Sequence, residues 1–173
     1  MTNVVLSSFP PLSNKHAKIL IIGSMPGGES LRLQQYYAHP RNAFWYIITQ
    51  LLGSDDDIHY EQKIALLKKK NIAIWDVLMS CEREGSLDTA IRNDSIVIND
   101  FAEFYATHPQ IKTLYFNGAK AEQEYKKRVI PTLAPHLQSM PSYRLPSSSP
   151  AMARLTKEEK LKHWSIILEP LTS

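Results

Sequence analysis

The chain has 173 residues and a formal net charge of +3, which is compatible with a polyanionic partner but does not require one. Hydrophobic residues make up 43% of it and charged residues 21%, a composition that argues against disordered and fibrous proteins. The single cysteine, Cys81, excludes an intrachain disulfide, a zinc site of several thiolates and an iron–sulfur cluster.

The first third of the chain contains one predicted strand and two predicted helices. Residues 18–22 form a short, largely apolar run that ends at a glycine, which is typical of a strand buried on both faces. A loop rich in Gly and Pro is expected over residues 24–40. Apolar residues recur at helical spacing over residues 42–52. A second helix is expected over residues 60–70, ending in three lysines that suit the helix dipole.

The rest of the chain continues to alternate strands with helices. The predicted strands are residues 71–77, 112–116 and 142–145, the predicted helices are residues 101–108, 119–129 and 156–168, and residues 80–93 are expected to form a polar loop.

This alternation predicts an α/β fold in a single domain over residues 1–173. Helices should cover both faces of a central, mostly parallel sheet of four strands, in three layers. Ligands bind at the carboxyl ends of the strands in such sheets. Three segments are therefore candidates for a binding site, namely residues 24–40, 76–81 and 146–150.

The first candidate segment opens with Gly23-Ser24-Met25-Pro26-Gly27. Glycine lets a ligand approach the backbone closely, and proline stiffens the turn. The spacing matches neither the dinucleotide-binding fingerprint nor the phosphate-binding P-loop. Taken alone, the motif fits a plain strand-to-helix turn slightly better than a binding site.

Residues 36–45 concentrate aromatic and polar side chains just after this motif. Tyr37 and Phe44 are candidates for a surface on which a nucleic-acid base stacks. Asn42 stands where a helix N-cap is expected, and its side chain could instead orient a water molecule. His39 could be a catalytic imidazole, although shaping the turn before Pro40 is the more ordinary role.

A rigid, hydroxyl-rich loop follows the last predicted strand. Hydroxyls and free backbone amides suit phosphate oxygens, although Ser/Pro loops are also common without any such role. The loop consists of Ser147, Ser148, Ser149, Pro150 and Ala151.

Together these segments resemble the uracil-DNA glycosylase superfamily. In order, that family has a Gly-x-x-Pro-Gly loop after the first strand, an aromatic residue that stacks on the base, a base-reading residue after the second strand, and a Ser-Pro loop near the C-terminus. The matching segments here are Gly23 to Gly27, residues 37–45, Trp75-Asp76-Val77, Asn117-Gly118-Ala119 and residues 147–151, within a resemblance that covers residues 18–168.

One departure narrows the resemblance to a branch of the family. Most branches place Asp or Asn at the third position of the first motif, where it activates or positions water, but here that position is Met25. This pattern, followed by His39-Pro40-Arg41-Asn42, looks most like the hypoxanthine-DNA glycosylase branch. The resemblance implies that Asn42 takes over the role of activating or positioning water.

The resemblance implies a monofunctional DNA glycosylase that hydrolyses the N-glycosidic bond of a deaminated base flipped out of DNA, with no metal and no cofactor. Hypoxanthine is the expected base and uracil the alternative. Asn42 would position the water, and the backbone of residues 23–27 would line the sugar and base. Tyr37 or Phe44 would stack on the base, while Asn117 would lie in the base pocket. Asp76 would accept a hydrogen bond from the N–H of the base, or else simply cap its loop.

The remaining expectations concern DNA and location. The three serines would contact phosphates, and the stretch from Met152 to Arg154 would fill the gap that the flipped base leaves. Residues 1–10 lack the features of a signal peptide, and no apolar stretch is long enough to span a bilayer. We therefore expect a monomeric, cytoplasmic protein, associated with the nucleoid if it is bacterial, with DNA and no membrane as its partner.

Two other functions fit the same features. One is a nucleotide- or phosphate-binding module of flavodoxin-like fold that cleaves no bond. The other is an inactive superfamily member that binds nucleic acid, which Met25 would explain.

Overall fold

The computed structural model describes residues 4–172, and a parallel sheet of four strands lies at its centre. The strand order is β3-β2-β6-β7, and all three neighbouring pairs are parallel. The strands are β2 (Ile19–Gly23), β3 (Ile72–Asp76), β6 (Thr113–Asn117) and β7 (Ser142–Leu145). This sheet confirms the predicted α/β fold class and each of the four predicted strands.

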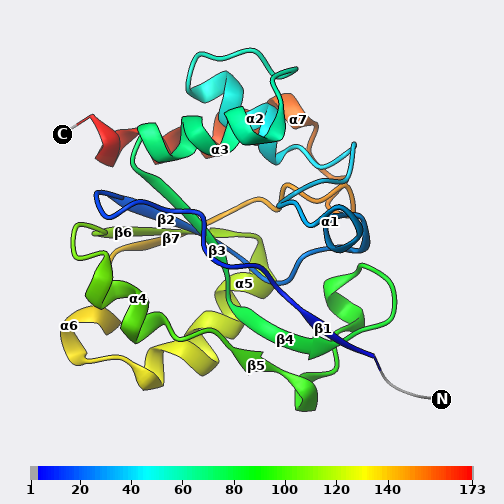
Figure 1. Ribbon diagram of the computed structural model, residues 1–173, viewed down its shortest axis with the longest axis vertical. Coiled ribbons are helices and arrows are strands. Elements are labelled where there is room, and N and C mark those ends of the chain that lie inside the picture. Colours follow the sequence, from blue (N-terminus) through cyan, green and yellow to red (C-terminus); the bar gives the residue numbers. More distant parts are fainter. Residues whose placement is uncertain (1–3, 173) are drawn as a thin grey trace.

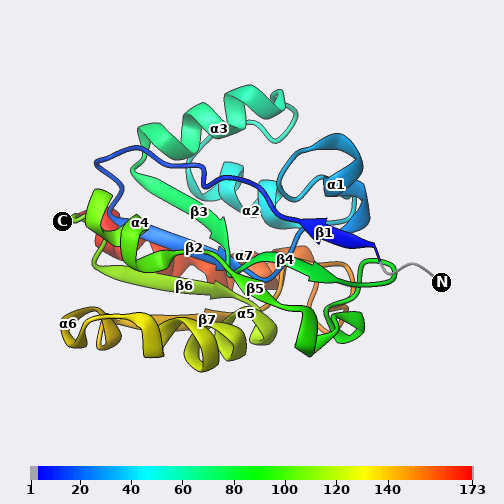
Figure 2. The same ribbon diagram turned by 60° about the horizontal axis from the view of Figure 1, so that its bottom comes forward.

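Helices cover both faces of this sheet (Figure 1). One face carries α2 (Phe44–Leu51), α3 (Tyr60–Lys69) and α7 (Lys157–Trp164), and the other carries α4 (Phe101–Thr107), α5 (Ala119–Glu124) and α6 (Pro135–Gln138). The view in Figure 2 shows the same three layers from another side.

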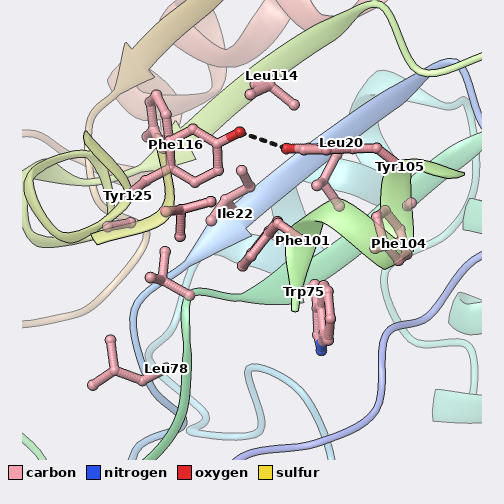
Figure 3. Packing of buried hydrophobic residues seen from close by; sticks show 14 of the residues in the cluster. Leu20, Ile22, Trp75, Leu78, Phe101, Phe104, Tyr105, Leu114, Phe116 and Tyr125 are labelled. Atoms are coloured by element: carbon pink, nitrogen blue, oxygen red, sulfur yellow. Dashed lines mark hydrogen bonds between the residues drawn. The ribbon is translucent and has the colours of Figure 1, made fainter. Parts of the chain in front are cut away.

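The layers are held together by apolar residues that alternate along the strands. Every residue of β2 is buried, with Ile21 packed into the α2, α3 and α7 layer and Ile22 into the α4 and α5 layer. Successive side chains of a strand point to opposite faces, so a central strand covered on both sides must be apolar throughout. Figure 3 shows the apolar residues packed between the sheet and the α4 and α5 layer. Among them, the hydroxyls of Tyr105 and Tyr125 lie 2.7 Å apart in a hydrogen bond.

Two segments differ from the prediction. The expected loop over residues 24–40 contains a short helix, α1 (Gly28–Leu33), and the expected polar loop over residues 80–93 begins inside a strand, β4 (Leu78–Glu82). β4 belongs to a second, antiparallel sheet with the order β1-β4-β5, in which the partners are β1 (Val5–Ser7) and β5 (Val97–Ile98). Such short strands depend on partners far away in sequence, and local periodicity does not reveal those.

Two of the predicted helices change geometry before they end. The helix predicted over residues 119–129 continues from α5 into a π-helical turn, Tyr125–Val129, and α7 continues into a 3₁₀ segment, Ser165–Leu171. Pro170, which cannot donate a backbone hydrogen bond, lies in that last segment. Within residues 4–172, no helix combines the length and apolarity needed to cross a membrane.

Candidate active site

The carboxyl ends of the central strands open into a pocket of about 680 Å³. Gly23 ends β2, Asp76 ends β3 and Asn117 ends β6, and all three residues line the pocket. Its volume falls in the range of roughly 300–1,000 Å³ that is usual for small-ligand sites. Residues predicted from separate parts of the sequence are thus brought to one place at the edge of the sheet.

Gly23 lets two functional side chains approach the first motif. A Cβ atom at this position would collide with Asp76 Oδ1 and would lie only 2.8 Å from the Tyr37 hydroxyl. The backbone of residues 23–27 lines the pocket as expected, and Met25 adds no polar group because its side chain packs into the α4 and α5 layer of the core. A glycine is therefore required here for close packing of the site.

The carboxyl group of Asp76 is buried in the lining of the pocket, and only 3% of the residue is exposed. Burial raises its pKa to about 7, the negative charge of Asp88 raises the pKa further, and the guanidinium of Arg83 opposes both effects. Near neutral pH this group therefore changes between a hydrogen-bond donor and a pure acceptor.

Tyr37 and Phe44 were both expected to stack on a base, and the structure gives them different positions. Tyr37 lines the pocket, whereas Phe44 is fully buried and lies outside the lining. The two rings stack on each other, with centroids 4.0 Å apart and an angle of 26° between their planes. Phe44 therefore packs against the Tyr37 ring, and of these two residues only Tyr37 lines the pocket.

The Tyr37 hydroxyl is buried without a hydrogen bond of good geometry among the described residues. Burial and the nearby Asp76 carboxyl raise the pKa of this hydroxyl well above its usual value. Its backbone φ of 53° is also uncommon for a residue other than glycine. An unsatisfied group and an unfavourable backbone conformation at a pocket wall are features often found at functional sites.

Asn42 lines the pocket at the start of α2. Its Oδ1 accepts a hydrogen bond of 2.9 Å from the backbone N–H of Phe44, the first residue of α2, but the N-cap of that helix is Ala43 and not Asn42 as the sequence suggested. A carbonyl oxygen has two lone pairs, so this hydrogen bond leaves one acceptor site for a water molecule. A role for Asn42 in orienting water is therefore compatible with its contact to α2. His39 also lines the pocket, and its Nδ1 accepts from the backbone N–H of Arg41 at 3.0 Å, which shapes the turn.

Asn117 joins β6 to the hydroxyl-rich loop. Its Nδ2 donates to the Ser148 hydroxyl and its Oδ1 accepts from the Ser148 backbone N–H, both at 2.9 Å. Ser148 is itself buried, and its carbonyl accepts from the backbone N–H of Ala43. The Ser148 hydroxyl is thus occupied inside the protein. Ser147 and Ser149 are partly exposed, and their hydroxyls accept hydrogen bonds from the backbone N–H groups of Ser149 and Ala151.

Two residues of α7 hold the same loop from the other side. The ammonium group of Lys160 donates to the Ser149 carbonyl at 3.1 Å, and the indole N–H of Trp164 donates to the Pro146 carbonyl at 2.9 Å. Lys160 is 4% exposed, and burial lowers its pKa. Pro150, Ala151 and Met152 continue the pocket wall, while Arg154 is exposed and lies outside the lining.

One wall of the pocket comes from a segment that the sequence did not single out. Ser86, Leu87, Asp88 and Thr89 line the pocket, although residues 80–93 were expected to be only a polar loop. They reach the site because β4 carries the chain beyond the edge of the parallel sheet before the loop returns. The polar residues after a predicted strand could have indicated that this loop lines the pocket. The path by which the loop returns to the pocket, however, depends on the second sheet.

This loop is fastened to the first motif by hydrogen bonds. Arg83 Nη2 donates to the Pro26 carbonyl at 2.7 Å, and the Ser86 hydroxyl accepts from the Gly28 backbone N–H at 2.8 Å. Arg83 is 7% exposed, and its Nη1 has no partner among the described residues. The loop is therefore a fixed part of the pocket wall.

Comparisons with known proteins agree with this arrangement. The family model of the uracil DNA glycosylase superfamily matches residues 10–172. A curated protein from Methanosarcina acetivorans named hypoxanthine DNA glycosylase is 36% identical over 168 residues, covering 95% of this chain and 98% of the relative. A protein of the same name from Methanosarcina barkeri is 40% identical over 114 residues, covering 65% of this chain and 71% of the relative.

A solved structure shares the fold. It is the solution NMR structure of a Methanosarcina acetivorans protein with a provisional uracil DNA glycosylase name, and it superposes with a TM-score of 0.80 at 34% identity. The match covers 98% of this chain and all of that chain. The motif order, the pocket at the strand ends and the family match agree, and the chain belongs to the uracil DNA glycosylase superfamily.

Proposed function

We propose that this protein is a monofunctional DNA glycosylase of base excision repair that removes hypoxanthine from DNA. The observation that carries the proposal is the placement of Tyr37, Asn42 and Asp76 in one pocket beside the first motif. These residues supply, in turn, a ring for stacking, an oxygen for orienting water and a carboxyl for the edge of a base. Relatives named hypoxanthine DNA glycosylase support the choice of base.

The base enters the pocket only after it has left the duplex. A base inside a duplex must be flipped out before its glycosidic bond can be attacked, and a mispaired base is the least costly to extrude. The flipped base lies against the Tyr37 ring, which is held in position by its stacking on Phe44. Because the pocket measures about 680 Å³, its volume does not exclude a two-ring purine.

Asp76 recognises the lactam edge of the base. In its ionised form the carboxylate accepts a hydrogen bond from N1–H of hypoxanthine, and it would equally accept N3–H of uracil. A carboxyl with a pKa of about 7 is ionised in an appreciable fraction of molecules at neutral pH. Uracil is therefore the second candidate substrate, since its edge presents the same acyl–NH pattern.

Asn42 positions the attacking water. The water oxygen bonds to C1′ of the deoxyribose, the C1′–N bond breaks with its electron pair leaving on the base, and the proton that the water loses passes to the departing base. Ser147 and Ser149 contact the DNA phosphates, while Ser148, whose carbonyl accepts from the backbone N–H of Ala43 beside Asn42, holds their loop in place. The stretch from Met152 to Arg154 fills the gap in the duplex.

The test is a cleavage assay on labelled duplexes that each contain one hypoxanthine, uracil or xanthine, followed by alkali. Strand breaks at hypoxanthine are the expected result. Asn42→Ala should lower the single-turnover rate by about 10²–10³-fold while the affinity for DNA changes little, because it removes a group that acts in the transition state. Wild-type protein that binds the duplexes but breaks none of them would instead indicate a non-catalytic binding module.

Two further variants separate chemistry from folding. Asn42→Asp keeps an oxygen that can accept from the Phe44 backbone N–H, so it should stay folded and cleave faster than Asn42→Ala. Gln50→Ala removes an exposed amide from the same helix and should cleave at the wild-type rate. Full activity of a folded Asn42→Ala protein would show that the water is positioned by another residue.

A further inference from the structure

A carboxylate from outside the first motif stands directly beside it. Asp88 Oδ1 accepts a hydrogen bond of 2.7 Å from the Ser24 hydroxyl, and both residues line the pocket. Met25, the next residue of the motif, directs its side chain into the core. The motif therefore contributes no acidic side chain, and the acid next to it comes from the loop after β4.

The position of Asp88 is determined by more than one contact. The same loop is held to the motif through the Pro26 carbonyl and the Gly28 backbone N–H, two and four residues beyond Ser24. Asp88 is partly exposed within the pocket, unlike the buried Asp76. The carboxylate is therefore both held in place and open to a bound substrate.

Hydrolysis of an N-glycosidic bond is accelerated by such a group. As the C1′–N bond breaks, positive charge develops on the deoxyribose before the water oxygen bonds to C1′. A preorganised negative charge beside the sugar stabilises that transition state without reorganisation. An amide such as Asn42 can orient the water, but it carries no net charge to oppose that of the sugar.

We propose that Asp88, oriented by Ser24, is the catalytic carboxylate that stabilises the positive charge on the deoxyribose. This inference rests on the proposed glycosylase function. It assigns Asp76 and Asp88 different tasks, with Asp76 beside Gly23 facing the base and Asp88 beside Ser24 facing the sugar, while Glu29, the third carboxyl of the lining, is paired with Arg32. The loop thereby replaces the acidic side chain that Met25 does not provide.

The experiment measures single-turnover cleavage of a hypoxanthine duplex together with the Kd for the same duplex under conditions in which cleavage is negligible. Asp88→Asn keeps the shape of the side chain and removes its charge, so the cleavage rate should fall by about 10²–10³-fold with little change in Kd. Asp88→Glu keeps the charge and should recover part of the rate. Ser24→Ala, which removes only the orienting hydrogen bond, should have an intermediate effect.

The matched control is Glu84→Gln, which removes an exposed carboxylate from the same loop outside the pocket and should leave the rate unchanged. If the wild type cleaves and folded Asp88→Asn cleaves at the same rate, Asp88 is not the catalytic carboxylate, although the proposed function stands. A weaker Kd with an unchanged rate would also overturn the assignment, because it would indicate binding alone. If the wild type cleaves no lesion, the proposed function itself fails.

Discussion

At the scale of single residues, the burial of Asp76 lowers the stability of the folded protein by a measurable amount. Its pKa is about 7 in the folded protein, against an ordinary value of 3.8. The folded state therefore holds a proton that the unfolded chain releases between these two pH values, so the stability of the fold decreases as pH rises through that window. Above about pH 7 the cost no longer grows.

Replacing Asp76 with Asn should therefore stabilise the protein in a pH-dependent way. The gain in Tm should be larger at pH 8 than at pH 5, by several degrees, since one pKa unit corresponds to about 1.4 kcal/mol and 1 kcal/mol to about 2–4 °C in a chain of this size. Thermal unfolding of both proteins at both pH values measures this. Asp57→Asn, which changes an exposed carboxyl, should show no such difference. Equal gains at pH 5 and pH 8 for Asp76→Asn would contradict the raised pKa.

At the scale of secondary-structure elements, the hydroxyl-rich loop after β7 is held from three directions. Asn117 binds it from the end of β6, Lys160 from within α7, and Trp164 from the end of that helix. Loops are usually the more mobile part of a fold, but buried backbone groups with fixed partners restrain them. The loop that we propose to contact DNA is therefore restrained by these hydrogen bonds.

Asn117→Ala should loosen the hydroxyl-rich loop after β7. It leaves the buried N–H and hydroxyl of Ser148 without their partner, which costs about 1–3 kcal/mol for a buried unsatisfied group. Denaturant unfolding should show that loss, and duplex affinity should weaken because the loop is no longer preorganised. Ser148→Ala removes only the hydroxyl and keeps the hydrogen bond from the Ser148 backbone N–H to Asn117. It should therefore lower the stability by less than Asn117→Ala. Stability losses that simply add in the double variant would show that the two side chains do not interact.

At the scale of the whole molecule, a second hollow of about 810 Å³ extends the binding surface beyond the pocket. The pocket and this second hollow share four lining residues, namely Tyr37, His39, Arg41 and Asn42. Lys63 and Lys157 line the second hollow, and the ammonium of Lys157 lies 4.4 Å from the centre of the Tyr46 ring. If the proposed function holds, these two cations would suit the DNA backbone on one side of the lesion.

Removing both lysines tests this path for the DNA. The Lys63→Ala, Lys157→Ala double variant should bind duplex DNA more weakly and with a smaller dependence on salt, by roughly 0.9 in the log–log slope for each phosphate that the protein no longer neutralises. Affinity measured at several salt concentrations gives the slope. Lys69→Ala, which removes an exposed lysine at the other end of α3, is the control. An unchanged slope in the double variant would place the DNA elsewhere.

The sequence by itself determined the central layer of this protein. Apolar residues predicted β2, β3 and β6, because a strand buried on both faces must be largely apolar, and a fourth short strand was predicted at β7, which lies at the edge of the sheet and is partly exposed. The polar residues that follow these runs were then expected at one edge, since parallel strands end on the same side. Local pattern was sufficient to place Gly23 and Asp76 there because each ends a strand of that sheet, whereas Asn117, which ends β6, was named only through the family resemblance.

Only the tertiary structure decided how the pocket is completed. Asp88 reaches Ser24 across 64 positions of sequence because β4 pairs with β1 and β5 and turns the chain back over the motif. Phe44 and Tyr37 have similar chemistry in the sequence, but packing buries the first and leaves the second at the wall. Contacts between distant segments depend on pairing and packing that no local pattern records, so they become visible only when the chain is folded.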